Sequence, residues 1–104
     1  MKEYDVFLSH NNTDKGAVEE IARRLVKEGI DPWLDKWNLI PGEPWQPAIE
    51  EALDSCSTCA VFIGTGGTGL WQNEEMRAAI DQRVRRSSGG FRVIPVLLPR
   101  AVKR

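Results

Sequence analysis

The sequence predicts an α/β domain in which a parallel sheet lies between two layers of helices. Four short apolar runs, near residues 4–9, 31–35, 59–64 and 91–98, have the composition of strands, and segments of helical periodicity separate them. This alternating order with short connections gives a parallel sheet with helices on both faces, because right-handed crossovers return over the sheet. A chain of 104 residues is long enough for one such domain with a single core.

The first strand is predicted at residues 4–9, which are rich in β-forming side chains. The polar residues 10–14 include several helix-capping types, so they form a loop that leads into a helix. That helix is predicted over residues 15–28, because apolar side chains recur on one helical face: Val18, Ile21, Ala22, Leu25 and Val26. Gly29 directly after it is a typical helix stop.

A short second strand is predicted at residues 30–35, where Pro32 and two acids indicate a sheet edge or a strand end. Residues 37–44 form a loop in which two prolines flank a glycine. The second helix begins at Trp45, with Pro47 in its first turn, where proline is tolerated. Its apolar stripe is expected to contain Trp45, Ile49, Ala52, Leu53 and Cys56.

The third strand is predicted at residues 59–63, which are fully apolar and therefore central in the sheet. A glycine-rich turn at residues 64–69 leads into a helix over residues 71–85. Residues 87–90 break that helix, and a fourth strand follows at residues 91–98.

Ligands of open parallel sheets bind outside the carboxyl ends of the strands. The site is therefore expected among residues 9–12, 35–37, 64–75 and those after Leu98. The glycine run matches the dinucleotide fingerprint G-x-G-x-x-G, but the acid that would bind the ribose about 20 residues further on is absent. We interpret the run as a flexible tight turn, and the lack of a following lysine excludes a P-loop.

Charge and composition exclude several classes of function. Acidic residues number 15 and basic residues 14, which argues against electrostatic capture of nucleic acid or of an anionic membrane. No run approaches the roughly 18 apolar residues that a bilayer span requires, and residues 1–4 lead directly into the first strand, so we expect no signal peptide. The two cysteines indicate a reducing compartment, so we expect a cytoplasmic domain.

The sequence does not meet the requirements of a redox, metal, Ser-His or phosphoacceptor site. Cys56 and Cys59 have redox spacing, but they follow a helix C-terminus, where the dipole opposes a thiolate, so they are predicted to be buried structural cysteines. His10 is the only histidine, which leaves neither a histidine metal cluster nor a Ser-His triad, and no metal is expected. A phosphoacceptor receiver domain would need an aspartate where this chain has Gly64 and Thr65.

Two carboxylates, Glu74 and Glu75, follow Trp71 at the start of the predicted third helix. The apolar face of this helix directs Glu74 toward solvent; it comprises Met76, Ala79, Ile80 and Val84. Glu75 lies on the flank of the helix over Trp71, since residues four apart share a face. On the pattern alone, Glu75 is either a catalytic carboxylate or an acid that complements the helix dipole.

Three segments, in order, carry a resemblance to a known family. Residues 4–10, residues 33–42 and the Trp71-x-x-x-Glu75 pattern resemble three boxes of the Toll/interleukin-1 receptor (TIR) domain, of the kind found in bacterial immune proteins. Each box alone is weakly specific, whereas three at the right spacing make the match strong. The resemblance implies a flavodoxin-like three-layer sandwich, and we expect the family's fifth strand to be missing from residues 1–104.

The resemblance implies cleavage of NAD+ at the nicotinamide–ribose bond, giving nicotinamide and ADP-ribose or a cyclic isomer. NAD+ is then the substrate, and no cofactor is expected. Nicotinamide leaves as a neutral molecule, so one carboxylate can suffice, and the resemblance assigns that catalytic role to Glu75. It also implies that five residues line the substrate pocket: Ser9, His10, Asn11, Asp35 and Trp71.

The resemblance further implies self-association through a loop that packs against a neighbouring TIR domain and contains Trp37, Pro41, Gly42, Pro44 and Trp45. Core packing is the alternative role for the two tryptophans. Some animal relatives have a basic pair where this chain has Asn11 and Asn12, so phosphate binding would rest on amides and hydroxyls. We expect residues 1–104 to be a TIR domain that is truncated at its C-terminus or belongs to a longer protein with a sensor or effector domain.

The function implied is therefore an NAD+ glycohydrolase, switched on by self-association in prokaryotic immune signalling such as antiphage defence. A non-catalytic adaptor that acts only through TIR–TIR assembly is the main alternative, although an adaptor has no need of Glu75. A nucleoside-processing transferase on a similar sheet is a third hypothesis, which the ordered boxes disfavour.

Overall fold

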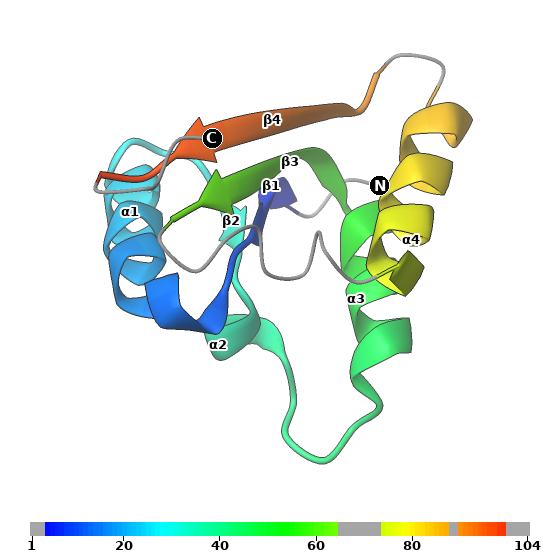
Figure 1. Cartoon of the computed structure of the whole chain (residues 1–104), viewed down its shortest axis with the longest axis horizontal. Helices are drawn as coiled ribbons and strands as arrows, with labels where there is room; N and C mark the ends of the chain where they lie inside the picture. The colour runs from blue at the N-terminus through cyan, green and yellow to red at the C-terminus, as the bar shows by residue number, and fades with distance from the viewer. Residues whose placement is uncertain (1–3, 65–73, 88–89, 100–104) are drawn as a thin grey trace.

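Four parallel strands form a sheet in the order β2-β1-β3-β4 (Figure 1). The computed structural model describes residues 4–64, 74–87 and 90–99, without the side chains of Asn12 and Glu75. β1 pairs with both β2 and β3, and β4 extends the sheet beyond β3. The bounds are β1 Tyr4–Ser9, β2 Pro32–Trp33, β3 Cys56–Ile63 and β4 Arg92–Leu97.

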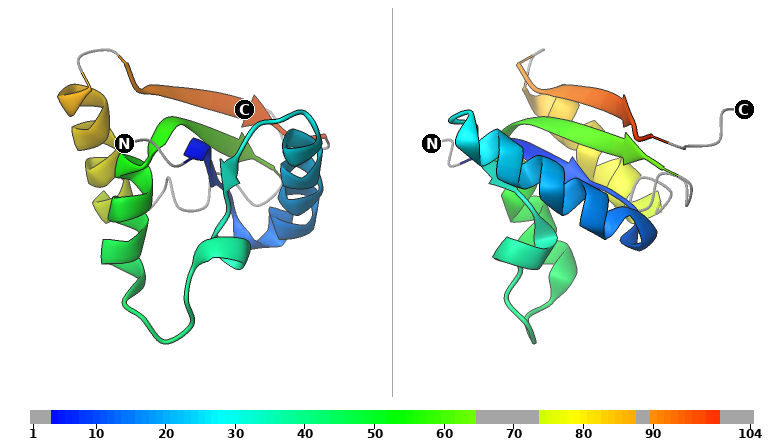
Figure 2. Two further views of the ribbon diagram at one scale, coloured as in Figure 1. Left: turned by 180° about the vertical axis from the view of Figure 1, so that it is seen from behind. Right: turned by 90° about the vertical axis from the view of Figure 1, so that its left-hand side faces the viewer.

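Helices cover both faces of the sheet, as the sequence predicted (Figures 1 and 2). Helix α1 (Lys15–Lys27) lies on one face, and α3 (Trp45–Asp54) and α4 (Glu74–Arg86) lie side by side on the other. A one-turn helix, α2 (Asp35–Asn38), follows β2, and the 3-10 turn η1 (Asn12–Asp14) precedes α1. Of the helices in the described ranges, none has the length and apolar character needed to span a bilayer.

Two apolar clusters form the core, one on each face of the sheet. Successive strand residues alternate between them: Phe7 belongs to the cluster under α3 and α4, whereas Leu8 belongs to the cluster under α1. In β3, Val61 and Phe62 alternate in the same way. The Phe7 ring stacks on Trp33 with the ring centroids 4.8 Å apart. Because both faces are covered, these strands appear in the sequence as continuous apolar runs.

The second strand is shorter than predicted. Only Pro32 and Trp33 pair with β1, at the sheet edge that Pro32 indicated. Asn38 ends the strand, because its side-chain oxygen accepts the Leu34 N–H at 3.0 Å and its own N–H donates to the Leu34 carbonyl at 2.9 Å. These bonds turn the chain out of the sheet, so Asp35 begins α2 instead of ending β2.

Three predicted helix positions were wrong. Cys56 pairs with Tyr4 and therefore opens β3, which starts three residues before the predicted 59, rather than closing the stripe of α3. Val26 and Trp45 are 54% and 43% exposed, and neither belongs to a core cluster. Both stand in a terminal turn, Val26 at the end of α1 and Trp45 at the start of α3, beyond the buried part of the stripe.

Within the described residues, β4 is an edge strand. Pro95 lies in it, and proline is tolerated there because it has no N–H to donate to a further strand. Ile94 and Leu97 of this strand are 46% and 50% exposed. The observed strand, Arg92–Leu97, agrees with the predicted run at residues 91–98 to within one residue at each end.

Arg83 ties α4 to the neighbouring elements. Its Nε donates to the Leu53 carbonyl in α3 at 2.9 Å, and Nη2 donates to the Cys56 carbonyl at the start of β3, also at 2.9 Å. The guanidinium group lies over the Phe91 ring, 4.5 Å from its centroid. A charged donor thus satisfies two carbonyls at the junction of α3 and β3.

We expect Arg83→Met to lower the free energy of unfolding by about 2 kcal/mol, because two charge-assisted hydrogen bonds and a cation–π contact are lost. Urea denaturation measures the change. Arg85→Met is the matched control: the Arg85 side chain is 78% exposed and, among the described residues, pairs with Asp81 one turn back, so it should change stability by about 0.5 kcal/mol or less. Equal losses in the two variants would contradict the role given to Arg83.

Candidate functional site

The strand order marks the carboxyl ends of β1 and β3 as the place where a ligand is expected to bind, and we refer to this place as the crevice. The chain leaves β1 for β2 on one side and later returns to β3 on the other, so the direction of winding reverses between β1 and β3. Open α/β sheets bind ligands at such reversal points. Ser9 and His10 end the β1 side of the crevice, and Gly64 ends the β3 side.

Ser9 and His10 are buried polar residues with unused hydrogen-bonding atoms. They are 0% and 4% exposed. Ser9 Oγ and His10 Nε2 have no hydrogen-bond partner among the described residues. His10 Nδ1 lies 3.3 Å from the Leu8 carbonyl oxygen, so a proton on Nδ1 is directed to that oxygen. Buried polar atoms without an internal partner are uncommon in folded proteins, so these two atoms mark a place where water or a bound molecule can supply the partner.

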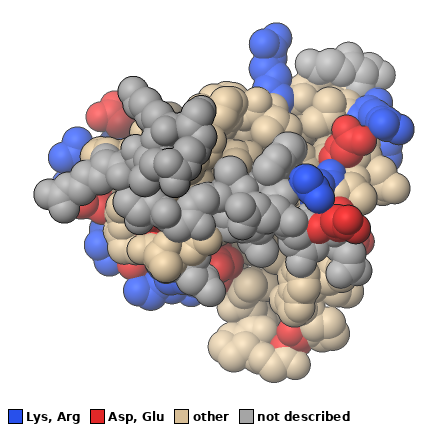
Figure 3. Space-filling view, viewed as in Figure 1, with Lys and Arg blue, Asp and Glu red and all other residues tan. Residues whose placement is uncertain are grey.

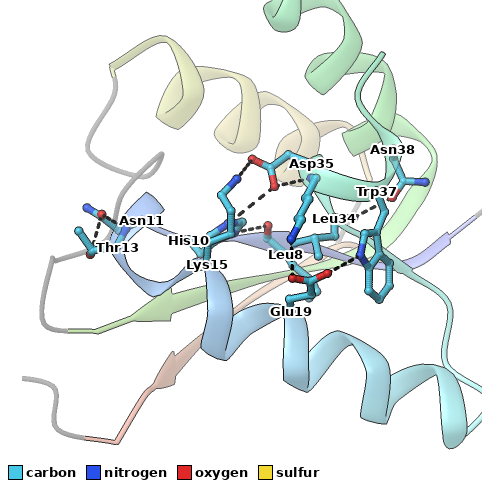
Figure 4. A network of polar contacts seen from close by, with 11 residues as sticks. Leu8, His10, Asn11, Thr13, Lys15, Glu19, Leu34, Asp35, Trp37 and Asn38 are labelled. Carbon is cyan, nitrogen blue, oxygen red and sulfur yellow. Dashed lines mark hydrogen bonds and ion pairs between the residues drawn. The ribbon is translucent and has the colours of Figure 1, made fainter. Parts of the chain in front are cut away.

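Asp35, the first residue of α2 after β2, lies close to His10 and Lys15 (Figure 4). Its Oδ1 lies 3.7 Å from His10 Nε2, and its Oδ2 accepts a hydrogen bond from Lys15 Nζ at 3.3 Å. The structure therefore places Asp35 beside His10, with Ser9 next to His10 in the chain, and the role of these residues in substrate binding stays a prediction. Lys15 was missed, because the first residue of a charged helix carries no motif. It supplies a cation at a site where the sequence offered only Asn11 and Asn12.

Asn11 shapes the loop after β1. Its side-chain oxygen accepts hydrogen bonds from the backbone N–H and the hydroxyl of Thr13, each at 2.9 Å. This is an Asx turn, which leads the chain into η1 and α1. Asn11 lies directly beside His10, and its predicted role in substrate binding remains a prediction.

Asp14 lies across the crevice against Gly64. Its Oδ2 is a third buried atom without a hydrogen-bond partner in the described part of the chain. A Cβ added to Gly64 would overlap the Asp14 carboxylate. Glycine at the end of β3 thus lets the loop before α1 approach the strand closely.

We expect Gly64→Ala to lower the free energy of unfolding by about 1–2 kcal/mol, because the Asp14 carboxylate must move. Urea denaturation of Gly64→Ala, alone and combined with Asp14→Ala, measures the effect, and the second substitution should remove most of the cost. The control is Gly16→Ala in α1, where an added Cβ meets nothing within 4 Å. That change should stabilise the protein by about 0.5–1 kcal/mol. Additive losses at Gly64 and Asp14 would contradict the contact.

Next to the crevice, Glu19 of α1 binds two residues of α2 (Figure 4). The carboxylate accepts hydrogen bonds from Lys36 Nζ at 2.9 Å and from the Trp37 indole N–H at 3.1 Å. The Lys36 bond, helped by Trp37, lowers the pKa of Glu19 from its ordinary value, although burial acts in the opposite sense. The ionised Glu19 carboxylate therefore stabilises the fold at pH values above the ordinary glutamate pKa, and this stabilisation is lost as the pH falls through the lowered pKa. Nothing in the sequence pattern identified Glu19.

The loop between α2 and α3 keeps most of its proposed contact residues at the surface. Pro41, Gly42 and Pro44 are exposed, and Ile40 is 60% exposed. Gly42 has φ +90°, a conformation that favours glycine. In Figure 3 the segment forms the lower end of the molecule and is mostly uncharged. A hollow of about 340 Å³ lies between this loop and α3.

Trp37 was predicted to lie in the same loop, and this was wrong. It lies in α2, and its indole N–H is bonded within the domain to Glu19. Trp45 does lie at the far end of the loop, at the start of α3, and is exposed.

Helix α4 has the predicted orientation. Glu74 is exposed, and Met76 and Ile80 are fully buried. The backbone of Glu75 lies in the first turn of α4, which is found toward the end of the molecule to which β3 and β4 point (Figure 2, right). The side chain of Glu75, the residue Trp71 and most of the glycine run lie outside the described residues.

The two cysteines are buried and free, as predicted. Burial raises the pKa of each thiol to about 12. Both therefore stay protonated near neutral pH and are poor nucleophiles. In the described ranges, no group of three or more histidine, cysteine, aspartate and glutamate residues is arranged to hold a metal ion.

Comparison with known proteins assigns this arrangement to a family. The family model of the TIR domain matches residues 6–104. The chain is 30% identical over 95 residues to "NAD(+) hydrolase PdTIR" of Paracoccus denitrificans (strain Pd 1222), covering 89% of this chain and 31% of that protein. It is 30% identical over 94 residues to "2' cyclic ADP-D-ribose synthase AbTIR" of Acinetobacter baumannii (strain 1295743), covering 88% and 34%. The chain thus spans about a third of the length of these relatives.

Solved structures share the fold at lower identity. The TIR domain of the Toll-related receptor TRR-2 from Hydra magnipapillata aligns with a TM-score of 0.71 at 16% identity, covering 98% of this chain and 75% of that one. The TIR domains of the activated Roq1 resistosome align with a TM-score of 0.69 at 22% identity, covering 91% and 57%. These likenesses support the flavodoxin-like arrangement of a parallel sheet between helices.

Proposed function

Because the chain belongs to the TIR domain family, we propose that it hydrolyses NAD+ at the nicotinamide–ribose bond. The observation that carries the proposal is the crevice at the end of β1, where buried Ser9 and His10 leave polar atoms unpartnered beside Asp35. Two relatives with about the same sequence identity are named for NAD+ hydrolysis and for synthesis of a cyclic ADP-ribose. The products are therefore nicotinamide and ADP-ribose or a cyclic isomer.

The chemistry requires little from the protein. The nicotinamide ring of NAD+ carries a positive charge and departs as a neutral molecule, so no acid is needed to protonate the leaving group. The ribose develops positive charge as the bond breaks, and a nearby carboxylate stabilises that charge. We assign this role to Glu75 in the first turn of α4, as the Trp-x-x-x-Glu pattern implied. Trp71 would shape the pocket around the nicotinamide ribose.

The crevice residues would hold the rest of the dinucleotide. Ser9 Oγ can donate a hydrogen bond to a hydroxyl or phosphate oxygen, and His10 Nε2, with the ring proton on Nδ1, can accept one from a ribose hydroxyl. Lys15 is 34% exposed at its side chain and can turn toward a phosphate while its pairing with Asp35 is loosened. Asp35 accepts hydrogen bonds, which suits a ribose hydroxyl.

We expect Glu75→Gln to lower the rate of nicotinamide release by at least about 100-fold, because the amide keeps the shape but loses the charge that stabilises the transition state. Release from NAD+ is measured by chromatography with protein that is concentrated or clustered on a multivalent support. Glu74→Gln is the matched control, since Glu74 is exposed on the same turn of α4, and it should keep the rate of the unmodified protein.

Equal turnover by Glu75→Gln and the unmodified protein would overturn the assignment of Glu75. If neither the unmodified protein nor a variant releases nicotinamide when clustered, the result favours the second candidate function, an adaptor that works only by TIR–TIR contact. The exposed apolar residues Ile40 and Trp45 around the loop before α3 are consistent with the TIR–TIR contact that both candidates require.

Self-association belongs to the same proposal. The exposed loop with Ile40, Gly42 and Trp45 would pack against a second TIR domain. The protein would act in the cytoplasm of a prokaryote, in immune signalling such as antiphage defence. A sensor or effector domain, in the same chain or in an associated protein, would bring the copies together.

We expect Trp45→Glu to weaken self-association, because a charge replaces an exposed indole on the contact surface. Light scattering across a concentration series measures the assembly, and nicotinamide release should fall in parallel at concentrations where the unmodified protein assembles. The control is Val26→Glu at the end of α1, where the replaced side chain is 54% exposed. Loss of assembly in Val26→Glu but not in Trp45→Glu would contradict the role of the loop and would indicate that the contact surface lies on α1.

A further inference from the structure

We propose that Glu19 is a positioning residue, which holds α2 so that Asp35 lies against His10 and Lys15. The inference rests on the proposed function and deepens it, because it identifies how the substrate-binding carboxylate is kept in place. Glu19 lies on α1, and its carboxylate faces Lys36 and Trp37 of α2 (Figure 4).

Both oxygens of the Glu19 carboxylate are occupied. Oε1 accepts from Lys36 Nζ at 2.9 Å, and Oε2 accepts from the Trp37 indole at 3.1 Å and from Arg23 at 3.2 Å. The Glu19 side chain is 12% exposed, so solvent screens these bonds less than it screens a surface ion pair. Two of the three donors belong to α2, which makes Glu19 a link between the two helices.

Helix α2 cannot hold its own position. It has four residues, which is a single turn, and none of them is buried. Isolated helices of this length do not form, because the first turn costs more conformational entropy than its hydrogen bond returns. Its placement therefore depends on contacts with other elements. The Asn38 contacts with Leu34 and Tyr4 hold its last residue, and Glu19 holds its middle.

Two ion pairs between α1 and α2 fix the position of α2 along α1. Lys15 and Glu19 are one turn apart on α1 and so share a face. They pair with consecutive residues of α2 in opposite sense: Lys15 with Asp35 at 3.3 Å, and Glu19 with Lys36 at 2.9 Å. Shifting α2 by one residue would set like charges against each other, which disfavours other registers.

Displacement of Lys36 would move Asp35, since the two are joined by the chain and by a further bond. Asp35 Oδ1 accepts the Lys36 backbone N–H at 2.7 Å, and the same oxygen lies 3.7 Å from His10 Nε2. Glu19 thus acts on the crevice through Lys36 and Asp35, without touching the substrate.

The test is Glu19→Gln, with Glu20→Gln as the control, because Glu20 is the exposed neighbour on α1. His10 is the only histidine in the chain, so its ring gives a single set of NMR signals. These signals should shift in Glu19→Gln together with the indole N–H of Trp37, and should stay in place in Glu20→Gln. Unchanged His10 signals in Glu19→Gln would reduce Glu19 to a stabilising residue and overturn the inference.

Turnover gives a second readout that a purely structural role would not produce. Glu19→Gln should lower nicotinamide release about 5- to 10-fold in the unmodified background and not at all in an Asp35→Asn background, because the effect runs through Asp35. The same loss in both backgrounds would overturn the inference. If Glu19→Gln fails to fold, Trp37→Phe, which removes one donor only, takes its place in both measurements. If the unmodified protein releases no nicotinamide, the proposed function fails, and the NMR comparison alone decides the role of Glu19.

Discussion

The parallel pairing of β1 with both β2 and β3 is the constraint on which the site depends. It brings the ends of three chain segments to one edge of the sheet: His10 after β1, Asp35 after β2 and Gly64 after β3. None of these residues is unusual in its own segment. They become candidates for a ligand site because the sheet aligns the three strand ends and because the winding reverses between β1 and β3.

The helices that carry the site are held by different forces. Helix α4 is fixed by apolar burial, with Met76 and Ile80 at 0% exposure, and by the Arg83 contacts at the junction of α3 and β3. Helix α2 buries no residue and depends on charged and polar contacts with α1. A catalytic carboxylate on α4 and a binding carboxylate on α2 would therefore differ in how easily they move, since polar contacts at partly exposed positions break more readily than a packed core.

The sequence was sufficient for what depends on local composition. The runs that became β1 and β3 have buried side chains on both faces, and the predicted burial of Met76 and Ile80 followed from helical periodicity alone. It was insufficient where a partner distant in the chain decides the outcome. Glu19 appeared to be one more charge on an amphipathic helix, because its partners lie 17 and 18 residues away. Trp37 was placed in a loop because a helix of four residues is too short to show a period.

The polar atoms left unpartnered in the crevice bear on the choice between an enzyme and an adaptor. A buried hydroxyl or imidazole nitrogen without a partner costs roughly 1–3 kcal/mol, and Ser9, His10 and Asp14 each hold one such atom among the described residues. Alanine at position 9 would avoid that cost, and a domain that works only through its outer surface gains nothing from keeping it. A domain that binds a ligand in the crevice recovers the cost when the ligand supplies the missing partners. Ser9 Oγ and His10 Nε2 therefore favour a function at the end of β1, where a ligand can reach them, over one located only on the loop before α3.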